Sequence, residues 1–182
     1  VYVSAWNATS ATLPSGQAIT FSYTTSTIKQ DSYVFESDYI TDVQNPSHGS
    51  SNSKIEKQTV TTPHLLAIES DLSKIEFVSS SGRLDLDGGL KLDAINVFSK
   101  ISNNYTEKYA FNYEYSTAST SNEYNPLNEG FFDKRLRLLS FQKLGTGGSP
   151  AQTWQFEFDP VKLPSRRSYA QDHWGYFKIG RA

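Results

Sequence analysis

The stretch RLDLDGGLKLDAINVFSKISNNYTEKYAFNYEY, residues 83–115, decides the fold class. It alternates apolar with polar residues on both sides of the Asp87-Gly88-Gly89 turn signal, and it alternates again along its aromatic end at 109–115. A period of two residues is typical of half-buried antiparallel strands, because successive side chains of a strand point to opposite faces. The stretch therefore predicts hairpins rather than helices.

A weaker copy of this pattern follows, as RLRLLSFQKL at 135–144, a glycine-rich loop, and TWQFEFD at 153–159. Corresponding positions lie 46 residues apart before the loops and 45 apart after them: Leu90, Leu92 and Ile95 match Leu136, Leu138 and Phe141, and Tyr109, Phe111 and Tyr113 match Trp154, Phe156 and Phe158. A period in this range indicates a chain built from repeated supersecondary units.

The apolar phase changes inside each copy. Leu92 lies in one phase and Ile95 in the other, and Leu138 likewise gives way to Leu139. Either both faces are buried there, or an extra residue shifts the phase. We predict a β-bulge in each copy.

Parity also predicts the geometry of the Asp87-Gly88-Gly89 turn. Residues paired across an antiparallel hairpin share a face, and a two-residue loop at either position would place leucines opposite charged residues. A three-residue loop, 87–89, instead pairs Leu86 with Leu90 and Leu84 with Leu92. We therefore predict a type I turn followed by Gly89 in the left-handed region.

A second hairpin is predicted around the turn at 70–73. One register satisfies both faces, since it pairs apolar residues on one face and opposite charges on the other. Its pairs are Ile68 with Ile75, Leu66 with Phe77, and Glu69 with Lys74.

The remaining segments follow the same logic of alternation and turn formers. Strands are expected at 1–6, 18–24 and 31–40, a turn at 14–16, exposed loops at 45–53 and 116–130, and a connecting loop at 145–150.

Composition bounds the class of protein. The 182 residues suit a single all-β domain, 1–182, or a fragment of a larger repeat protein, with a weak boundary near 45–53. The chain begins without Met, and we expect a piece of something longer. A net charge of −2 with well-mixed signs argues against nucleic acid as a partner. The sequence contains no run long enough for a membrane span and no signal peptide.

Metal binding is not expected. The chain has no cysteine, and the Asp85-Leu86-Asp87-Gly88-Gly89 stretch reads better as a turn than as a calcium loop, because strands rather than helices are expected around it. The histidines lie in separate segments without ligand spacing: His48, His64 and His173. We predict no metal and no cofactor.

Catalytic patterns are weak. Serine, aspartate and histidine crowd into residues 165–173 without a nucleophile elbow, so acyl transfer has little support. Acidic residues suited to glycoside hydrolysis occur, as they do in any β protein. The residues concerned are Ser165, Ser168, Asp172 and His173 for the first pattern, and Glu36, Glu157 and Asp172 for the second.

The most distinctive motif is Asp172-His173-Trp174-Gly175-Tyr176, which follows a polar, basic lead-in at 163–171. It resembles the Asp-His-Trp-Gly-Tyr-Tyr-Asn-Gly signature in large exported proteins of Bacteroidetes-type bacteria, which often carry Rhs/YD-type repeats further along the chain. The resemblance covers about residues 64–177, with similar patterns at 75–77, 83–86, 135–138 and 156–158. The chain departs from the signature at its end, where 177–180 read Phe-Lys-Ile-Gly in place of Tyr-Asn-Gly.

The resemblance implies a secreted or cell-surface, β-rich scaffold region and no catalytic residue in this segment. Rhs-type relatives wind β-strands into a shell around cargo. The expected partners are other segments of the parent protein, protein cargo or a surface glycan.

The candidate binding residues are Asp172, His173, Trp174 and Tyr176. In one interpretation Trp174 caps the open end of a sheet and Asp172 accepts backbone N–H bonds. In the alternative, the motif is a surface aromatic site for a glycan or a protein partner.

Together these observations predict an all-β protein of antiparallel hairpins that form a sandwich or a curved open sheet, with little helix. The expected function is a non-enzymatic structural or interaction module. The alternative is a carbohydrate-binding β-sandwich, and a glycosidase-type enzyme comes third. A row of exposed Trp or Tyr rings would favour the second function, and two carboxylates converging in a cleft would favour the third.

Overall fold

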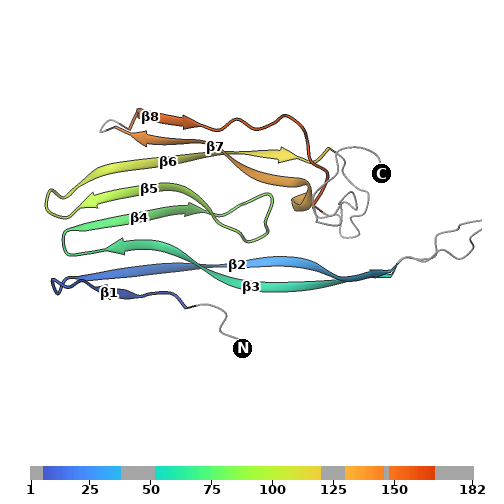
Figure 1. Ribbon diagram of the computed structural model, residues 1–182, viewed down its shortest axis with the longest axis horizontal. Helices are drawn as coiled ribbons and strands as arrows, with labels where there is room; N and C mark the ends of the chain where they lie inside the picture. The colour runs from blue at the N-terminus through green and yellow to red at the C-terminus, as the bar shows by residue number, and fades with distance from the viewer. Residues whose placement is uncertain (1–5, 38–51, 120–129, 146–147, 167–182) are drawn as a thin grey trace, which may run out of the picture.

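The computed structural model describes residues 6–37, 52–119, 130–145 and 148–166 (Figure 1). These residues form one eight-stranded antiparallel sheet in which the order of the strands is the order of the chain. The elements are β1 (Ser10–Thr12), β2 (Ala18–Ser37), β3 (Asn52–Glu69), β4 (Ser73–Ser80), β5 (Lys91–Ser99), β6 (Asn104–Thr117), the 3-10 turn η1 (Gly130–Asp133), β7 (Lys134–Leu144) and β8 (Pro150–Gln155). The all-β prediction is confirmed, and of the two predicted forms the open sheet is the one observed.

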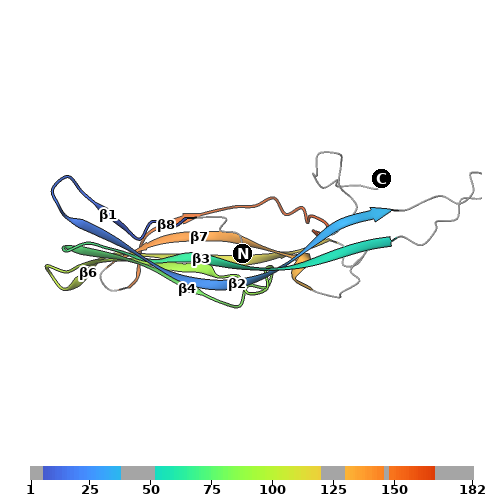
Figure 2. The same cartoon turned by 90° about the horizontal axis from the view of Figure 1, so that it is seen from below.

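The sheet is a single layer, as its edge-on view shows (Figure 2). In the part of the chain that the structure describes, the buried apolar side chains are few: Ile28, Ala67 and Pro164. Within the same residues, no helix is long and apolar enough to serve as a membrane span.

Cross-strand register places most large apolar side chains on one side of the sheet, which we call the apolar face. Residues paired across antiparallel strands share a face, so the pairs can be followed from β2 to β8. The face comprises Phe21, Ile68, Ile75, Phe77, Ile95, Val97, Tyr109, Phe111, Phe141 and Trp154. The opposite, polar face carries partners such as Glu69 with Lys74 and Asn112 with Ser140.

A bulge interrupts each repeat, as predicted. In β5 the partners of Val78 and Ser79 are Ala94 and Leu92, which leaves Asp93 as the extra residue. In β7 the corresponding shift leaves out Leu139. The two extra residues occupy equivalent positions, 46 residues apart, and each moves the following apolar side chains onto the same face as the preceding ones.

The predicted register of the β3–β4 hairpin is confirmed for Ile68 with Ile75 and for Glu69 with Lys74. The predicted pair of Leu66 with Phe77 is not formed, because the ladder ends one residue earlier and Leu66 is the extra residue of a bulge against β2. The direct ion pairs also differ from the prediction. The Lys74 ammonium lies 2.9 Å from Glu76, and Glu69 pairs with Lys100 at 2.7 Å.

The β2–β3 hairpin is much longer than its neighbours. Because the β3–β4 ladder stops at Ala67, the distal parts of β2 and β3 continue as a two-stranded ribbon. Two-stranded ribbons twist more strongly than wide sheets, and Figure 1 shows β2 crossing β3. Beyond the crossing, the free edge of β2 meets the connection between β4 and β5, where the Lys29 backbone N–H donates to the Asp87 carbonyl at 3.1 Å.

The predicted geometry of the Asp87-Gly88-Gly89 turn is wrong. Strand β4 pairs directly with β5 from Ser80 and Lys91 onward, so residues 81–90 form an irregular connection and Leu86 does not pair with Leu90. Gly88, not Gly89, has positive φ, at 76°. The physical reason is a tertiary contact: a Cβ atom on Gly88 would lie 1.8 Å from the Thr27 carbonyl oxygen of β2, a position that a side chain cannot occupy.

The other predicted segments have mixed outcomes. The turn at 14–16 is confirmed, with Gly16 at φ 85°, and the strands at 18–24 and 31–37 are parts of β2. The loops predicted at 45–53 and 116–130 are shorter than expected among the described residues. Asn52 and Ser53 already belong to β3, and β6 continues to Thr117. Trp6 is not in a strand, and residues 1–5, 38–51 and 120–129 lie outside the described residues.

Candidate functional site

The four residues of the C-terminal motif that sequence reasoning proposed for binding, Asp172, His173, Trp174 and Tyr176, lie outside the described residues, as do His48 and Ser168. Of the other candidates, Ser165 is buried and Glu157 is exposed in the segment after β8. The His64 Nε2 atom lies 2.8 Å from the Ser26 hydroxyl across the β2–β3 ribbon. These described candidates lie on different parts of the fold and form no common site.

In the structure, the side chains best placed to contact a ligand or a partner lie instead on the apolar face. Four rings from three adjacent strands, which we call the aromatic row, stack across the sheet: Tyr109 and Phe111 from β6, Phe141 from β7, and Trp154 from β8. Ring centroids are 5.6 Å apart for Tyr109 and Phe141, 5.5 Å for Phe111 and Phe141, and 4.6 Å for Phe141 and Trp154. Interplanar angles of 19° to 23° make all three pairs stacked.

This stacking decides what the aromatic row presents to a ligand. Phe141 is covered by Trp154 on one side and by the β6 rings on the other, so its two faces are occupied. A sugar ring binds by stacking on an aromatic face, whereas a packed protein layer needs only apolar area. The row therefore suits burial against apolar protein better than binding of a glycan.

A hollow lies beside the aromatic row on the same face. Its lining is apolar and comes from β5, β6, β7 and the segment after β8: Ile95, Tyr109, Phe111, Leu138, Phe141 and Phe156. Trp154, beside the hollow, is 44% exposed, and Phe156, in its lining, is 43% exposed. The apolar face thus has a shallow, open depression beside the half-exposed Trp154 indole.

A polar group borders the aromatic row. Glu107 accepts a hydrogen bond from the Tyr109 hydroxyl at 2.5 Å and pairs with the Lys143 ammonium at 2.7 Å. The hydrogen bond from Lys143 is the main cause that lowers the pKa of Glu107, and the same bond raises the pKa of Lys143. The two charges neutralise one another, so this border can be covered at less cost than an unpaired charge.

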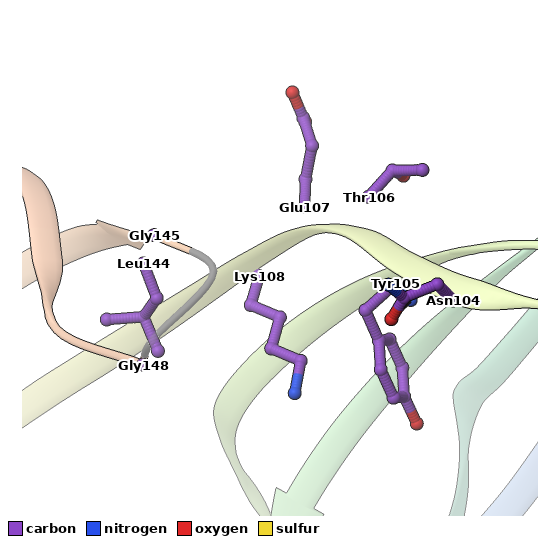
Figure 3. A pocket seen from close by; sticks show the side chains of 8 residues that line it. All are labelled: Asn104, Tyr105, Thr106, Glu107, Lys108, Leu144, Gly145 and Gly148. Carbon is purple, nitrogen blue, oxygen red and sulfur yellow. Dashed lines mark hydrogen bonds between the residues drawn. The ribbon is translucent and has the colours of Figure 1, made fainter.

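A second hollow, where β6 begins and β7 ends, is lined by Asn104 to Lys108 and by Leu144, Gly145 and Gly148 (Figure 3). The Lys108 ammonium lies 4.2 Å from the centroid of the Tyr105 ring. Glu107 points to the opposite side of β6 in Figure 3, so the carboxylate and the ammonium of these neighbours do not converge. The hollow therefore lacks an acid–base pair from its two charged lining residues.

The other end of the sheet is held by a buried carboxylate. Asp85 accepts two hydrogen bonds from Arg83, at 2.9 and 2.7 Å, and one from the Leu136 backbone N–H at 3.2 Å. Burial raises the pKa of Asp85, but the hydrogen bonds and the charge of Arg83 outweigh burial, and the net pKa lies below the ordinary value. Arg166 donates to the carbonyls of Asp85 and Phe131.

This cluster joins the 81–90 connection to β7, η1 and the segment after β8. Burial is the main cause that lowers the pKa of Arg135 and of Arg166, and the Arg135 guanidinium donates to the Pro164 carbonyl at 2.7 Å. Asp85 is thus occupied by protein donors rather than poised as a metal ligand. Among the described residues, no group of three or more His, Cys, Asp or Glu side chains is placed to hold a metal ion.

Sequence reasoning found part of this arrangement. The alternation at 109–115 and the match of Tyr109 to Trp154 placed these residues in strands of two repeats, but it did not predict that their rings stack in one row. The Glu107–Lys143 pair and the contact of Arg166 with Asp85 left no sequence signal, because their members lie 36 and 81 residues apart.

Comparison of the chain with protein-family models finds no match, and comparisons with curated proteins and with solved structures find none either. The resemblance of the C-terminal motif to exported Rhs/YD-type proteins therefore stays a prediction.

Proposed function

We propose that this chain is a non-enzymatic structural and interaction module of a large exported or cell-surface bacterial protein, a segment of sheet wall similar to the β-shells of Rhs/YD-type proteins. The observation that carries the proposal is the apolar face. It runs from β2 to β8 on a single-layer sheet, and no second layer covers it within the described residues.

The size of this face supports an interaction function. Seven strands spaced about 4.8 Å apart, counted over about 20 Å of strand length whether or not each residue is apolar, make a face of roughly 600 Å². That area reaches the upper end of the apolar patches found on ordinary monomers, about 300–600 Å². Removing this area from water is worth about 15 kcal/mol at 25 cal/mol per Å² before the cost of association is subtracted. A covering layer is therefore part of the expected working state.

The topology supports a wall that can be extended. Successive hairpins add in chain order, so a further hairpin would pair with the outer edge of β8 without rearranging the others. Strands that must stay unpaired usually carry charges on their edges. Both described edge strands, β1 (SAT) and β8 (PAQTWQ), carry no charged residue; β1 is only three residues long and β8 begins with Pro150, so the part of β8 after Pro150 is the edge that a further hairpin would use.

Carbohydrate binding remains the second candidate, because an exposed indole, Trp154, lies at the end of the aromatic row. It ranks second since the inner rings cover each other's faces. A glycan array probed with the chain and with Trp154→Ala distinguishes the two functions. Specific binding that is lost in a folded Trp154→Ala variant would establish the carbohydrate function instead.

The proposal is tested on the native protein. An antibody raised against this chain should detect, in the source cells, a polypeptide much larger than 20.4 kDa that is accessible to protease added outside the cell. Detection of a 20-kDa species protected inside the cell would show that the proposed function is wrong.

A further inference from the structure

We propose that the apolar face binds the apolar face of a second copy of this chain, so that two sheets pack as a two-layer sandwich about a two-fold axis. The inference rests on the proposed function of the face as an interaction surface, and it names the partner.

The area available matches what a stable dimer needs. Two faces of roughly 600 Å² each bury about 1,200 Å² in total when they meet. Specific protein–protein interfaces begin at about that size. Sheets that pack face to face lie about 10 Å apart, with side chains of the two inner faces interdigitated, so no third layer is required.

The shape of the face is self-complementary. A two-fold interface requires that a feature on one copy meets a different feature on the other, and that the reverse contact forms as well. The shallow, open hollow bounded by Ile95, Phe111 and Leu138 lies beside the half-exposed Trp154 on one surface. Rotation about a two-fold axis between them brings the indole of each copy into the hollow of the other.

The charges on the face permit this contact. Glu107 and Lys143 already pair at 2.7 Å at the border of the aromatic row, and the Tyr109 hydroxyl donates to the same carboxylate. A covering sheet therefore meets no unpaired charge at this border. Large apolar side chains with few charges are typical of the centre of an interface.

Edge-to-edge pairing through β8 is the competing arrangement for a second copy. It would add one short ladder along Pro150–Gln155 and would leave both apolar faces exposed to water. Because apolar area supplies the larger part of the driving force for association, the face-to-face arrangement is favoured.

Sedimentation velocity of the full chain, from 1 to 100 μM, tests the proposal. We expect a dimer, and we expect Trp154→Lys to weaken dimerisation at least tenfold. Val78→Lys is the matched control, because Val78 is equally exposed, at 43%, but pairs with Ala94 on the polar face. Circular dichroism shows whether each variant keeps its sheet.

Cross-linking identifies the arrangement, because the chain has no cysteine of its own. A mixture of Leu138→Cys and Trp154→Cys chains should form disulfide-linked heterodimers, since the knob of one copy meets the hollow of the other. Thr153→Cys should not link to itself, whereas edge pairing centred on Thr153 would link it efficiently.

A chain that stays monomeric at 100 μM overturns the proposal, and so does a dimer that Trp154→Lys leaves intact or that links through Thr153→Cys. If the chain stays monomeric but binds a hydrophobic dye, the apolar face is exposed and a molecule other than a second copy covers it in the native protein. None of these outcomes changes the test of the proposed function, which depends on the size and location of the native protein.

Discussion

Replacement of Asp85 by alanine should lower the free energy of unfolding more than replacement of Glu107 or Lys143, the ion pair at the border of the aromatic row. The side chain is 7% exposed, and it holds Arg83, itself 23% exposed, through two hydrogen bonds. It also accepts the backbone N–H of Leu136 in β7, 51 residues away. Its loss therefore releases two donors at once.

The magnitude follows from these contacts. Removing one partner of a buried ion pair costs about 3–5 kcal/mol, because the remaining charge stays without a partner. Arg83 keeps some access to water, so we take the lower end, about 3 kcal/mol. Asp85→Asn keeps an acceptor for the Leu136 N–H and should cost about 1–2 kcal/mol. Combining Asp85→Asn with Arg83→Met should cost less than the sum of the single changes, since neither group is then left alone.

Urea unfolding at pH 7 measures these differences, and acid titration adds an independent check. The folded pKa of Asp85 lies below the ordinary value of 3.8. A carboxyl whose pKa is lowered by folding stabilises the protein above its unfolded pKa, and this contribution disappears as the pH falls through the folded pKa. The gap between the native chain and Asp85→Asn should therefore close below about pH 4. A loss of less than 1 kcal/mol in Asp85→Ala, or a gap that persists at low pH, would refute the reasoning.

Three further predictions follow from other parts of the chain. Gly88→Ala should cost at least about 2 kcal/mol in urea unfolding, because its Cβ would lie 1.8 Å from a carbonyl of β2 at a positive φ. A Cβ on Gly89 would meet the Leu86 and Arg83 side chains, at 2.9 and 3.2 Å, rather than backbone, so Gly89→Ala should cost less than Gly88→Ala; equal losses would contradict the observed turn. Glu107→Gln should reduce the loss of thermal stability expected as the pH falls below about 4.5, since the hydrogen bond from Lys143 lowers the folded pKa of Glu107; an unchanged pH profile would count against this pair. If Trp174 caps the sheet, Trp174→Ala should cost about 3–5 kcal/mol, and an unchanged denaturation midpoint would exclude the cap.

The local features of the fold were within reach of the sequence. A period of two identified the strands, and charge and apolar parity set the pairing of Ile68 with Ile75. The odd spacing from Leu92 to Ile95, repeated near Leu139, located both bulges. These features depend on side chains that are neighbours along the strand or across one hairpin, so their signals lie in a short window of sequence.

The candidate site was only partly predictable. Alternation identified Tyr109, Phe111 and Trp154 as residues of one kind of strand, but period two is the same for a sugar-binding surface and for a packed face. The stacking of Phe141 between its neighbours, which distinguishes the two, depends on ring orientations across three strands. The C-terminal motif with Trp174 lies outside the described residues and stays a prediction.

By itself, the sequence determined an all-β chain of antiparallel hairpins with one apolar and one polar face. The tertiary structure alone decided that these hairpins form one open layer, that β2 and β3 cross, and that residues 81–90 leave the ladder. The prediction of the turn at 87–89 failed because the rule that paired residues share a face takes account only of the two strands of one hairpin. In the folded chain, Asp87 bonds to β2, and Asp85 binds the backbone of β7. Such contacts join residues more than fifty positions apart, and the twist of the sheet, which brings them together, has no local signature in the sequence.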